Sequence, residues 1–312
     1  MSLTALAPAT VLAAPMTLLP AAAPVVTPDR RVLDTAFPLP LPGWGAADAV
    51  AALRQASPML PVPLADPAVV SALTTVVLRA GAYAVKVYPP GTDPEHLRHL
   101  TAALSGSTAA HVPCAPPVVT DHGVLVLSTW QPATGPVSWS RLGGLLRSFH
   151  DQHADVPMAP WAPLSRLPGQ AALLPPDAAG VLLEARAALL DALAGVRSEL
   201  GEGLIHGDVS PSNVLGTPDG PRLIDLDWVA RAPREYDLSS ASRRYRAGEI
   251  SRRTYAGFCR GYGFDVCSWP GLPVLDRVAD LGGVVFRIWD SLHHGRDLRW
   301  LERELRRWRT PL

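Results

Sequence analysis

The sequence is poor in the residue types on which several classes of protein depend. Its 312 residues contain three cysteines, Cys114, Cys259 and Cys267, and no Cys-x-x-Cys pair. This argues against a disulfide framework and against a zinc site. Lys+Arg and Asp+Glu both number 28, so the basic excess that is typical of a nucleic-acid-binding protein is missing. We therefore expect a cytoplasmic protein with reduced thiols and no nucleic-acid partner.

The N-terminal segment lacks charge altogether. Its first 28 residues are mostly Ala, Pro, Leu, Val and Thr, but the basic region that begins a signal peptide is absent, and repeated prolines interrupt any apolar helix. We expect residues 1–30 to form a disordered Ala/Pro-rich tail. No later stretch is uncharged and apolar over the length that a membrane span requires, so we expect no contact with a membrane.

The remaining chain changes in character near residue 130. Before it, apolar periodicity and turn residues predict a small mixed lobe over residues 31–130, with helices at 46–56 and 93–104 and strands at 71–79, 82–88, 117–120 and 124–128. A segment rich in helix breakers at 132–136 suits a hinge. After it, long amphipathic patterns at 139–153 and 178–200, and nearly everything beyond Tyr236, predict a larger, mainly helical lobe over residues 131–312. The predicted fold class is α+β.

Lysine and asparagine each occur only once in the chain, and both of these residues lie in segments that carry candidate functional residues. Lys86 is the only lysine and Asn213 the only asparagine. Asn213 ends the segment His-Gly-Asp-Val-Ser-Pro-Ser-Asn at 206–213, and Leu-Ile-Asp-Leu-Asp follows at 223–227. Phosphoryl transfer requires a carboxylate to receive the proton of the attacking hydroxyl, oxygen ligands for Mg²⁺ and a cation on the phosphates. Asp208, Asn213, Asp225 and Lys86 are residues of these types.

Each of these residues also has an ordinary structural interpretation. Asp208 and Asn213 are residue types that loops use, and Lys86 could be a surface residue of an alternating strand. Asp225 and Asp227, two apart on a strand, point to one face, where paired like charges favour a bound cation. A solvent-exposed strand end is the alternative for Asp227.

Taken together, these motifs resemble the aminoglycoside phosphotransferase and choline kinase family. The resemblance implies a bilobal protein-kinase-like fold and an enzyme that uses ATP, or another nucleoside triphosphate, with Mg²⁺. It further implies the following roles: Asp208 as catalytic base, Asn213, Asp225 and Asp227 as metal ligands, Lys86 on the α- and β-phosphates, Glu95 as the partner of that lysine, Trp130 near the adenine, and Asp237 as a brace of the catalytic loop. A glutamate in a first helical turn, as at Glu95, is also favoured by the helix dipole alone.

Departures from the protein-kinase pattern indicate the kind of acceptor. Residues 70–77 contain no glycine, there is no Asp-Phe-Gly, and the stretch between Asp227 and Glu235 is too short for an activation segment. We therefore expect a small-molecule hydroxyl acceptor, bound by helices over 236–294 and by the loop at 157–176. An aminoglycoside would need a carboxylate-rich pocket. That region contains four candidate aspartates, but also several arginines: Asp265, Asp276, Asp280, Asp290, Arg243, Arg244, Arg246, Arg252 and Arg253.

Two other functions remain as alternatives at this point. A nucleotide-binding pseudokinase on the same fold would be favoured by loss of Asp208, Asn213 or Asp225, all of which are present. A hydrolase that used Asp225 and Asp227 with two metal ions would leave Lys86 unexplained. The acceptor itself, the choice between ATP and GTP, and the oligomeric state are left open by the sequence.

Overall fold

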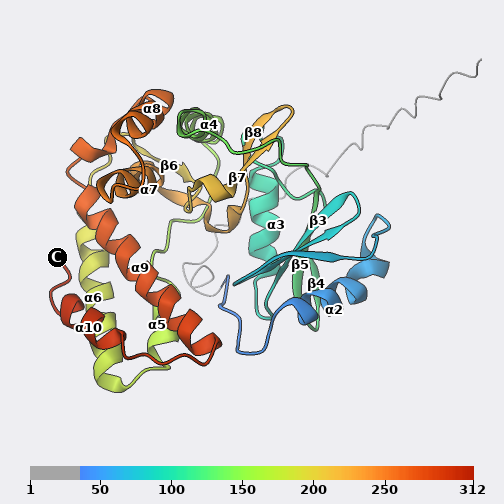
Figure 1. Cartoon of the computed structure of the whole chain (residues 1–312), viewed down its shortest axis with the longest axis horizontal. Helices are drawn as coiled ribbons and strands as arrows, with labels where there is room; N and C mark the ends of the chain where they lie inside the picture. The colour runs from blue at the N-terminus through green and yellow to red at the C-terminus, as the bar shows by residue number, and fades with distance from the viewer. Residues whose placement is uncertain (1–35) are drawn as a thin grey trace, which may run out of the picture.

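An antiparallel sheet with a helix on each face forms the first part of the structure. The computed structural model describes residues 36–312, so the expected tail at residues 1–30 lies outside the described residues. The five strands lie in the order β1-β2-β3-β5-β4 (Figure 1). The elements of this part are α2 (Ala46–Ala56), β1 (Ala68–Ala72), β2 (Val76–Ala80), β3 (Tyr83–Tyr88), α3 (Pro94–Ala103), β4 (Val118–Thr120) and β5 (Gly123–Thr129).

The side chains of β3 alternate between the two faces of this sheet. Val85 and Val87 belong to the core under helix α2, while Tyr88 packs with Leu97 of helix α3 on the opposite face. Because successive side chains of a strand point to opposite faces, Lys86 lies on the α3 face. That face is turned toward the helical part of the chain (Figure 1).

One expected strand is in fact two strands joined by a turn. The predicted strand at 71–79 is wrong: β1 ends at Ala72, residues 73–75 form a bend, and β2 begins at Val76. The bend contains Leu73, Thr74 and Thr75, none of which is a turn former like Gly, Pro or Asn, so the sequence carried no signal for it. Both strands pair antiparallel across this bend.

Helices form most of the remaining chain, together with two short strand pairs. The helices are α4 (Trp139–Gln152), α5 (Leu167–Ala171), α6 (Pro176–Ala194), α7 (Glu235–Arg246), α8 (Arg252–Tyr262), α9 (Leu272–His293) and α10 (Leu301–Trp308). The strand pairs are β6 (Glu202–Ile205) with β9 (Ala230–Pro233), and β7 (Val214–Thr217) with β8 (Gly220–Leu223). The expected succession of a small mixed part and a larger helical part is confirmed, whereas the boundary between residues 130 and 131 stays a prediction.

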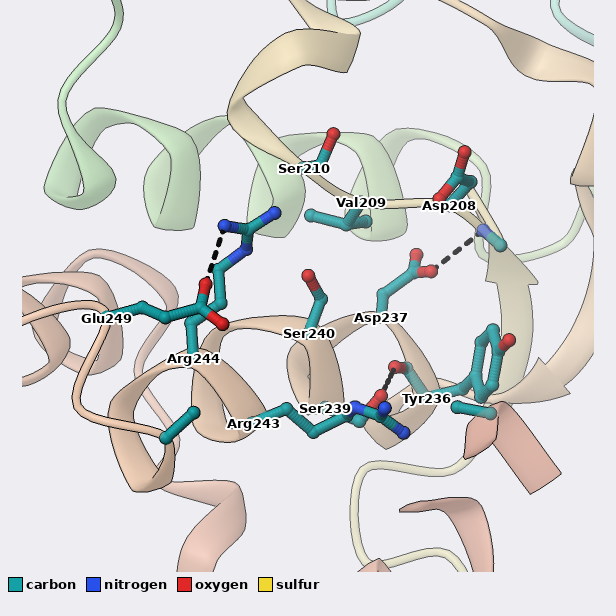
Figure 2. Close-up of a pocket in the computed structure, with 13 residues that line it drawn as sticks. Asp208, Val209, Ser210, Tyr236, Asp237, Ser239, Ser240, Arg243, Arg244 and Glu249 are labelled. Atoms are coloured by element: carbon teal, nitrogen blue, oxygen red, sulfur yellow. Dashed lines mark hydrogen bonds and ion pairs between the residues drawn. The ribbon is translucent and has the colours of Figure 1, made fainter. Parts of the chain in front are cut away.

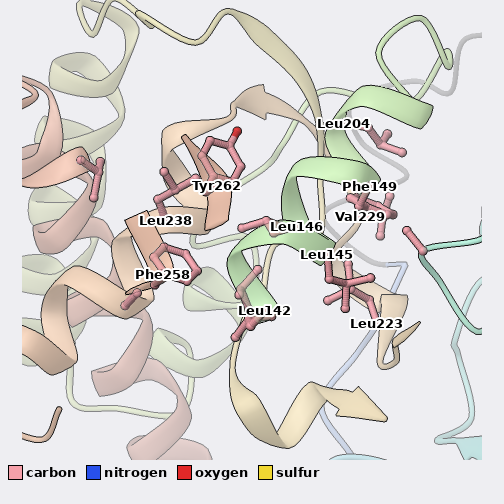
Figure 3. Close-up of a cluster of buried hydrophobic side chains, with 14 of the residues drawn as sticks. Leu142, Leu145, Leu146, Phe149, Leu204, Leu223, Val229, Leu238, Phe258 and Tyr262 are labelled. Atoms are coloured by element: carbon pink, nitrogen blue, oxygen red, sulfur yellow. The ribbon is translucent and has the colours of Figure 1, made fainter. Parts of the chain in front are cut away.

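Helix α4 connects the core of the helical part with the segment that carries the site. Its apolar residues Leu142, Leu146 and Phe149 meet Phe258 of α8 and the strands around the loop at 206–213 in one core (Figure 3). Helices α4 and α8 touch through their backbones: a Cβ at Gly143 would lie 2.3 Å from the carbonyl oxygen of Phe258. Only glycine allows this approach. On the same helix, His150 contacts Tyr262 of α8 and Asp237 of α7.

Within residues 36–312, none of the helices combines the length and the apolar character that crossing a membrane demands.

Candidate active site

The loop between β6 and β7 holds Asp208 and Asn213 against each other. The Asn213 Nδ2 donates to the backbone oxygen of Asp208 at 2.8 Å and to its Oδ2 at 3.0 Å. This fixes the rotamers of both side chains and turns the Asn213 Oδ1 away from Asp208. The loop therefore presents a carboxylate and an amide oxygen as a pair, as their spacing in the sequence predicts.

A buried aspartate holds the beginning of this loop. The Asp237 carboxylate, on the first turn of α7 and labelled in Figure 2, accepts hydrogen bonds from the backbone N–H of His206 at 2.6 Å and of Gly207 at 2.8 Å. It also contacts His150 Nε2 at 3.0 Å, and the other nitrogen of that ring lies 2.8 Å from the Tyr262 hydroxyl. The geometry agrees with the expected bracing role of Asp237 and adds His150, which the sequence did not single out.

Gly207 allows the loop to pass close to the next element. Its φ is 84°, and a Cβ there would lie 2.4 Å from the carbonyl oxygen of Trp228. Both the left-handed backbone and the lack of space exclude a larger residue. This is the physical reason for a glycine between His206 and Asp208.

Asp225 and Asp227 do not lie on a strand, contrary to the prediction for residues 223–227. Strand β8 ends at Leu223, Asp225 has a left-handed backbone with φ 61°, and Leu226–Trp228 form a 3-10 turn. Aspartate is one of the few residues besides glycine that adopt this conformation. The turn nevertheless directs both carboxylates to the same place, as their shared contact with Lys86 shows.

Lys86 joins the sheet to this turn. Its Nζ lies 2.5 Å from Asp225 Oδ1 and 2.7 Å from Asp227 Oδ2. The Tyr88 hydroxyl, two residues further along β3, donates to Asp227 Oδ1 at 2.7 Å. The structure thus brings together Lys86, Asp225 and Asp227 from parts of the chain about 140 residues apart in sequence.

The charges in this cluster shift one another's pKa values. Burial opposes the charge on Lys86, but Asp227 and Asp225 outweigh it and raise the pKa of the lysine. Burial likewise opposes the charge on Asp225, and Lys86 outweighs it and lowers the pKa of that carboxyl. Asp208 behaves differently: partial burial of its carboxyl group in the cavity wall raises its pKa, against the influence of His206. A carboxylate with a raised pKa is suited to receiving a proton.

Glu95 does not occupy the expected position. It pairs with Arg98 on the outer face of α3, its side chain is 77 % exposed, and the acidic partners of Lys86 among the described residues are Asp225 and Asp227. The expectation that Glu95 pairs with Lys86 is therefore wrong. The physical reason is the helix phase: Asp93 caps α3 by accepting from the Glu95 N–H, and the helix then buries the next side chain, His96, against Phe37.

Trp130 follows β5 at the edge of the sheet. Its backbone N–H donates to the Ala82 carbonyl at 2.7 Å, and the Arg79 guanidinium lies 4.9 Å from its ring centroid. The ring is half-buried beside the β2–β3 turn, and a role near the adenine stays a prediction.

The inward-facing His96 is expected to make the stability of the protein depend on pH. It is 5 % exposed, packs edge-on against Phe37, and its Nε2 has no hydrogen-bond partner within residues 36–312. Burial lowers the pKa of His96 despite the opposing effects of Asp93 and Asp227. The unfolded chain therefore binds a proton at this residue that the folded chain does not, and stability falls as the pH drops below about 6.5.

Substitution of this histidine tests that expectation. We expect His96→Phe to flatten the decline in the free energy of unfolding between pH 7 and pH 5, measured by urea unfolding. His111→Phe, in a loop and half-exposed, should keep the wild-type slope. An unchanged slope in His96→Phe would contradict the burial of a neutral imidazole.

The oxygen donors of the site suit a Mg²⁺ ion whose coordination shell is completed by substrate phosphates, rather than a metal site formed by protein ligands alone. In the part of the chain that is described, no group of three His, Cys, Asp or Glu side chains is arranged to hold a metal ion. Mg²⁺, however, prefers hard oxygen donors and is usually held through one or two carboxylates together with substrate phosphates. Asp225 and Asp227 offer two carboxylates that line one cavity, and Asn213 offers an amide oxygen from its position beside Asp208, so these residues fit such an ion.

Two cavities meet at Asp208. The first, here called the α7 cavity, has a volume of about 410 Å³ and lies between the loop at 206–213 and α7. It is lined by Asp208, Ser210, Ser240 and Arg244 among others (Figure 2). The second, here called the cleft cavity, measures about 450 Å³ and reaches from Asp208, Asp225 and Asp227 to the β1–β2 bend and to α9. The cleft cavity is the one that contains all three aspartates.

Solved structures with the same architecture are kinases of small molecules. Choline kinase LicA from Streptococcus pneumoniae superimposes with a TM-score of 0.55 at 14 % identity, over 83 % of this chain and 96 % of that one. Amicoumacin kinase hAmiN, in complex with AMP-PNP, Ca²⁺ and amicoumacin (Ami), gives 0.56 at 17 %, over 78 % and 86 %. A choline/ethanolamine kinase family protein from Mesorhizobium loti gives 0.53 at 15 %, over 82 % and 98 %. No curated protein sequence matches the chain.

The expected bilobal, protein-kinase-like α+β fold is thereby confirmed. A sequence model for the phosphotransferase enzyme family matches residues 69–281, more than half of the chain. The chain belongs to this family, and the resemblance seen in its motifs is confirmed.

Proposed function

We propose that this protein is a small-molecule kinase that transfers the γ-phosphoryl group of ATP to a hydroxyl group. The observation that carries the proposal is the convergence of Asp208, Asp225 and Asp227 on one cavity. Asp208 is paired there with Asn213, and the other two carboxylates are paired with Lys86. These are the groups that phosphoryl transfer needs. The kinase names of the structural neighbours support the same reaction class, and the free cysteines suit a cytoplasmic enzyme.

In the proposed reaction, Asp208 acts on the acceptor. Its carboxylate orients the acceptor hydroxyl and takes its proton as the new O–P bond forms and the bond between the β–γ bridging oxygen and the γ-phosphorus breaks, which releases ADP. Asn213 would keep Asp208 in position through its amide N–H while its oxygen joins Asp225 and Asp227 in holding Mg²⁺. The bound ion would neutralise charge on the phosphates.

Lys86 would hold the α- and β-phosphates. Because it already bridges β3 and the Asp225–Asp227 turn, only a small movement separates its ammonium group from phosphates bound between these elements. Tyr88 supports the arrangement through its bond to Asp227. Catalysis of this kind acts by positioning and electrostatics, without a covalent intermediate.

Nucleotide binding provides the first test. We expect Mg·ATP to raise the melting temperature of the wild-type protein, and Lys86→Met to weaken the affinity by about 10-fold or more, since a charge-assisted contact is lost. Arg54→Met, on the exposed face of α2, is the matched control. Absence of any Mg·ATP binding would overturn the proposal. Comparison of ATP with GTP in the same assay addresses the choice of nucleotide.

Turnover distinguishes a kinase from a pseudokinase. ADP release would be followed with a panel of amino alcohols, sugars, hydroxy acids, nucleosides and aminoglycosides. Acceptor-dependent release is the expected result. Mg·ATP binding without release for any acceptor would favour the pseudokinase instead.

A further inference from the structure

The cleft cavity has an apolar wall opposite the three aspartates. On one side it is lined by Val278, Val285 and Phe286 of helix α9, and on another by Trp161 and Leu164 of the segment that precedes α5. An acceptor whose hydroxyl reaches Asp208 from within this cavity would therefore bury apolar groups against this wall, which favours binding by about 25 cal/mol for each Å².

Among the described residues that line this cavity, one carries a positive charge. Arg166 lines it directly after the apolar segment. Its Nε donates to the Phe37 carbonyl at 2.8 Å, and its guanidinium lies 4.5 Å from the Trp228 ring centroid. These two contacts fix the plane of the guanidinium. Within residues 36–312, no carboxylate lies within 4.0 Å of it and its terminal nitrogens have no hydrogen-bond acceptor.

The electrostatics of Arg166 indicate that its charge is available to a ligand. Burial lowers the pKa of Arg166 to about 10, while Asp227 and Asp225 act in the opposite direction from a distance. The side chain is therefore charged at neutral pH and lacks a direct counter-ion among the described residues. A partly desolvated cation without a partner is unfavourable, and an anionic group on a ligand would supply the partner. A guanidinium with a fixed plane binds carboxylate or phosphate oxygens in pairs.

The acidic residues that could serve a polycationic acceptor are engaged elsewhere. Asp276 pairs with Arg246 at 2.6 Å, Asp280 pairs with Arg243 at 2.8 Å, and Asp290 pairs with Arg296. Asp265 accepts from the Tyr255 hydroxyl at 2.6 Å. None of the four lines the α7 cavity or the cleft cavity. The carboxylates that do line the cavities are also engaged: Asp225 and Asp227 contact Lys86, Asp237 accepts from backbone N–H groups, and Glu249 pairs with Arg244 at 3.0 Å. Apart from Asp208, which is assigned to the acceptor hydroxyl, the described lining residues thus offer no uncommitted carboxylate to a polycationic acceptor.

We propose that the acceptor is a hydroxyl compound with an apolar body and one anionic group, a carboxylate or a phosphate, and that Arg166 binds this group. The inference rests on the proposed function, because it assumes that the hydroxyl lies at Asp208. The γ-phosphate of ATP has the same chemistry as a phosphate on the acceptor, so the experiment has to separate an acceptor contact from a nucleotide contact.

Matched acceptor analogues test the proposal. Protein saturated with Mg·AMP-PNP would be titrated calorimetrically with probes that share an apolar phenyl body and differ in charge. Three of them carry a hydroxyl: 3-phenyllactate, 3-phenylpropane-1,2-diol and 2-amino-3-phenylpropan-1-ol. The fourth, 2-phenylethyl phosphate, carries a phosphate and no hydroxyl. We expect an anionic probe to bind about 10- to 100-fold more tightly than the neutral diol, as for a hydrogen bond to a charged group. Arg166→Met should abolish the difference, and Arg166→Lys should retain part of it.

The controls separate the possible failures. Arg303→Met, exposed on α10, should keep the preference for anionic probes. The proposal is overturned if no anionic probe binds more tightly than the diol, if the amino alcohol binds best, or if the preference survives in Arg166→Met. It is also overturned if Arg166→Met weakens Mg·AMP-PNP and leaves probe binding unchanged, since Arg166 would then serve the nucleotide. Wild-type protein that does not bind Mg·AMP-PNP at all contradicts the proposed kinase function itself.

Discussion

Asp208→Asn is expected to lower kcat by about 10²- to 10⁴-fold, the usual contribution of a general base. The substitution keeps the size of the side chain and removes the carboxylate that would receive the hydroxyl proton. The affinity for Mg·ATP should stay close to the wild-type value, because Asp208 is not among the groups assigned to the phosphates. The measurement is steady-state ADP release with the best acceptor of the panel, together with a separate Mg·ATP binding titration.

Two comparisons make this result specific. Asp155→Asn, at an exposed position after α4, changes the same functional group away from the cavities and should leave kcat unaltered. A kcat of Asp208→Asn within about tenfold of the wild type would contradict the assignment of Asp208 as the base. In that case another group in the cleft cavity would have to receive the proton.

Asp237→Ala is expected to destabilise the protein by about 3–5 kcal/mol, the range found when one partner of a buried charged network is removed. Asp237 is 2 % exposed. Its loss leaves the N–H groups of His206 and Gly207 and the ring of His150 without their acceptor, and each buried unsatisfied donor costs free energy. Urea unfolding at pH 7 measures the effect.

Two further variants keep the prediction testable if Asp237→Ala fails to fold. Asp237→Asn keeps one acceptor oxygen and should fall between the wild type and Asp237→Ala in the free energy of unfolding. Asp191→Ala, exposed on α6, should stay within about 0.5 kcal/mol of the wild type. If Asp237→Ala behaves like Asp191→Ala, the catalytic loop does not depend on α7 for its position.

Much of the candidate site could be predicted because its parts are local in sequence. Asp208 and Asn213 lie five residues apart on one loop, and their hydrogen bond follows from that spacing. Helices α2 and α3 could be predicted for the same reason, since periodicity and the Asp93 cap act within one or two turns. The family resemblance rested on these local signals and on two nearly absent residue types.

The parts that could not be predicted depend on the phase of an element or on contacts between distant segments. Glu95 does not pair with Lys86, because the phase of α3 places Glu95 on the exposed face of the helix and buries His96 instead. The left-handed backbone at Asp225 converts an apparent strand into a turn. The guanidinium of Arg166 is held in place by Phe37 and Trp228, which lie 129 and 62 residues away in sequence. No pattern within a short window carries such information.

The uniqueness of Lys86 offers a direct spectroscopic view of the cleft. It is the only side chain with an ε-amine, its side chain is 17 % exposed, and its amine sits between two carboxylates. Reductive methylation with ¹³C-formaldehyde would therefore introduce a single side-chain resonance, beside that of the N-terminal amine. Every change of that resonance on addition of nucleotide, metal ion or acceptor would report on this one position, so ligands could be ranked without assignment of any other signal.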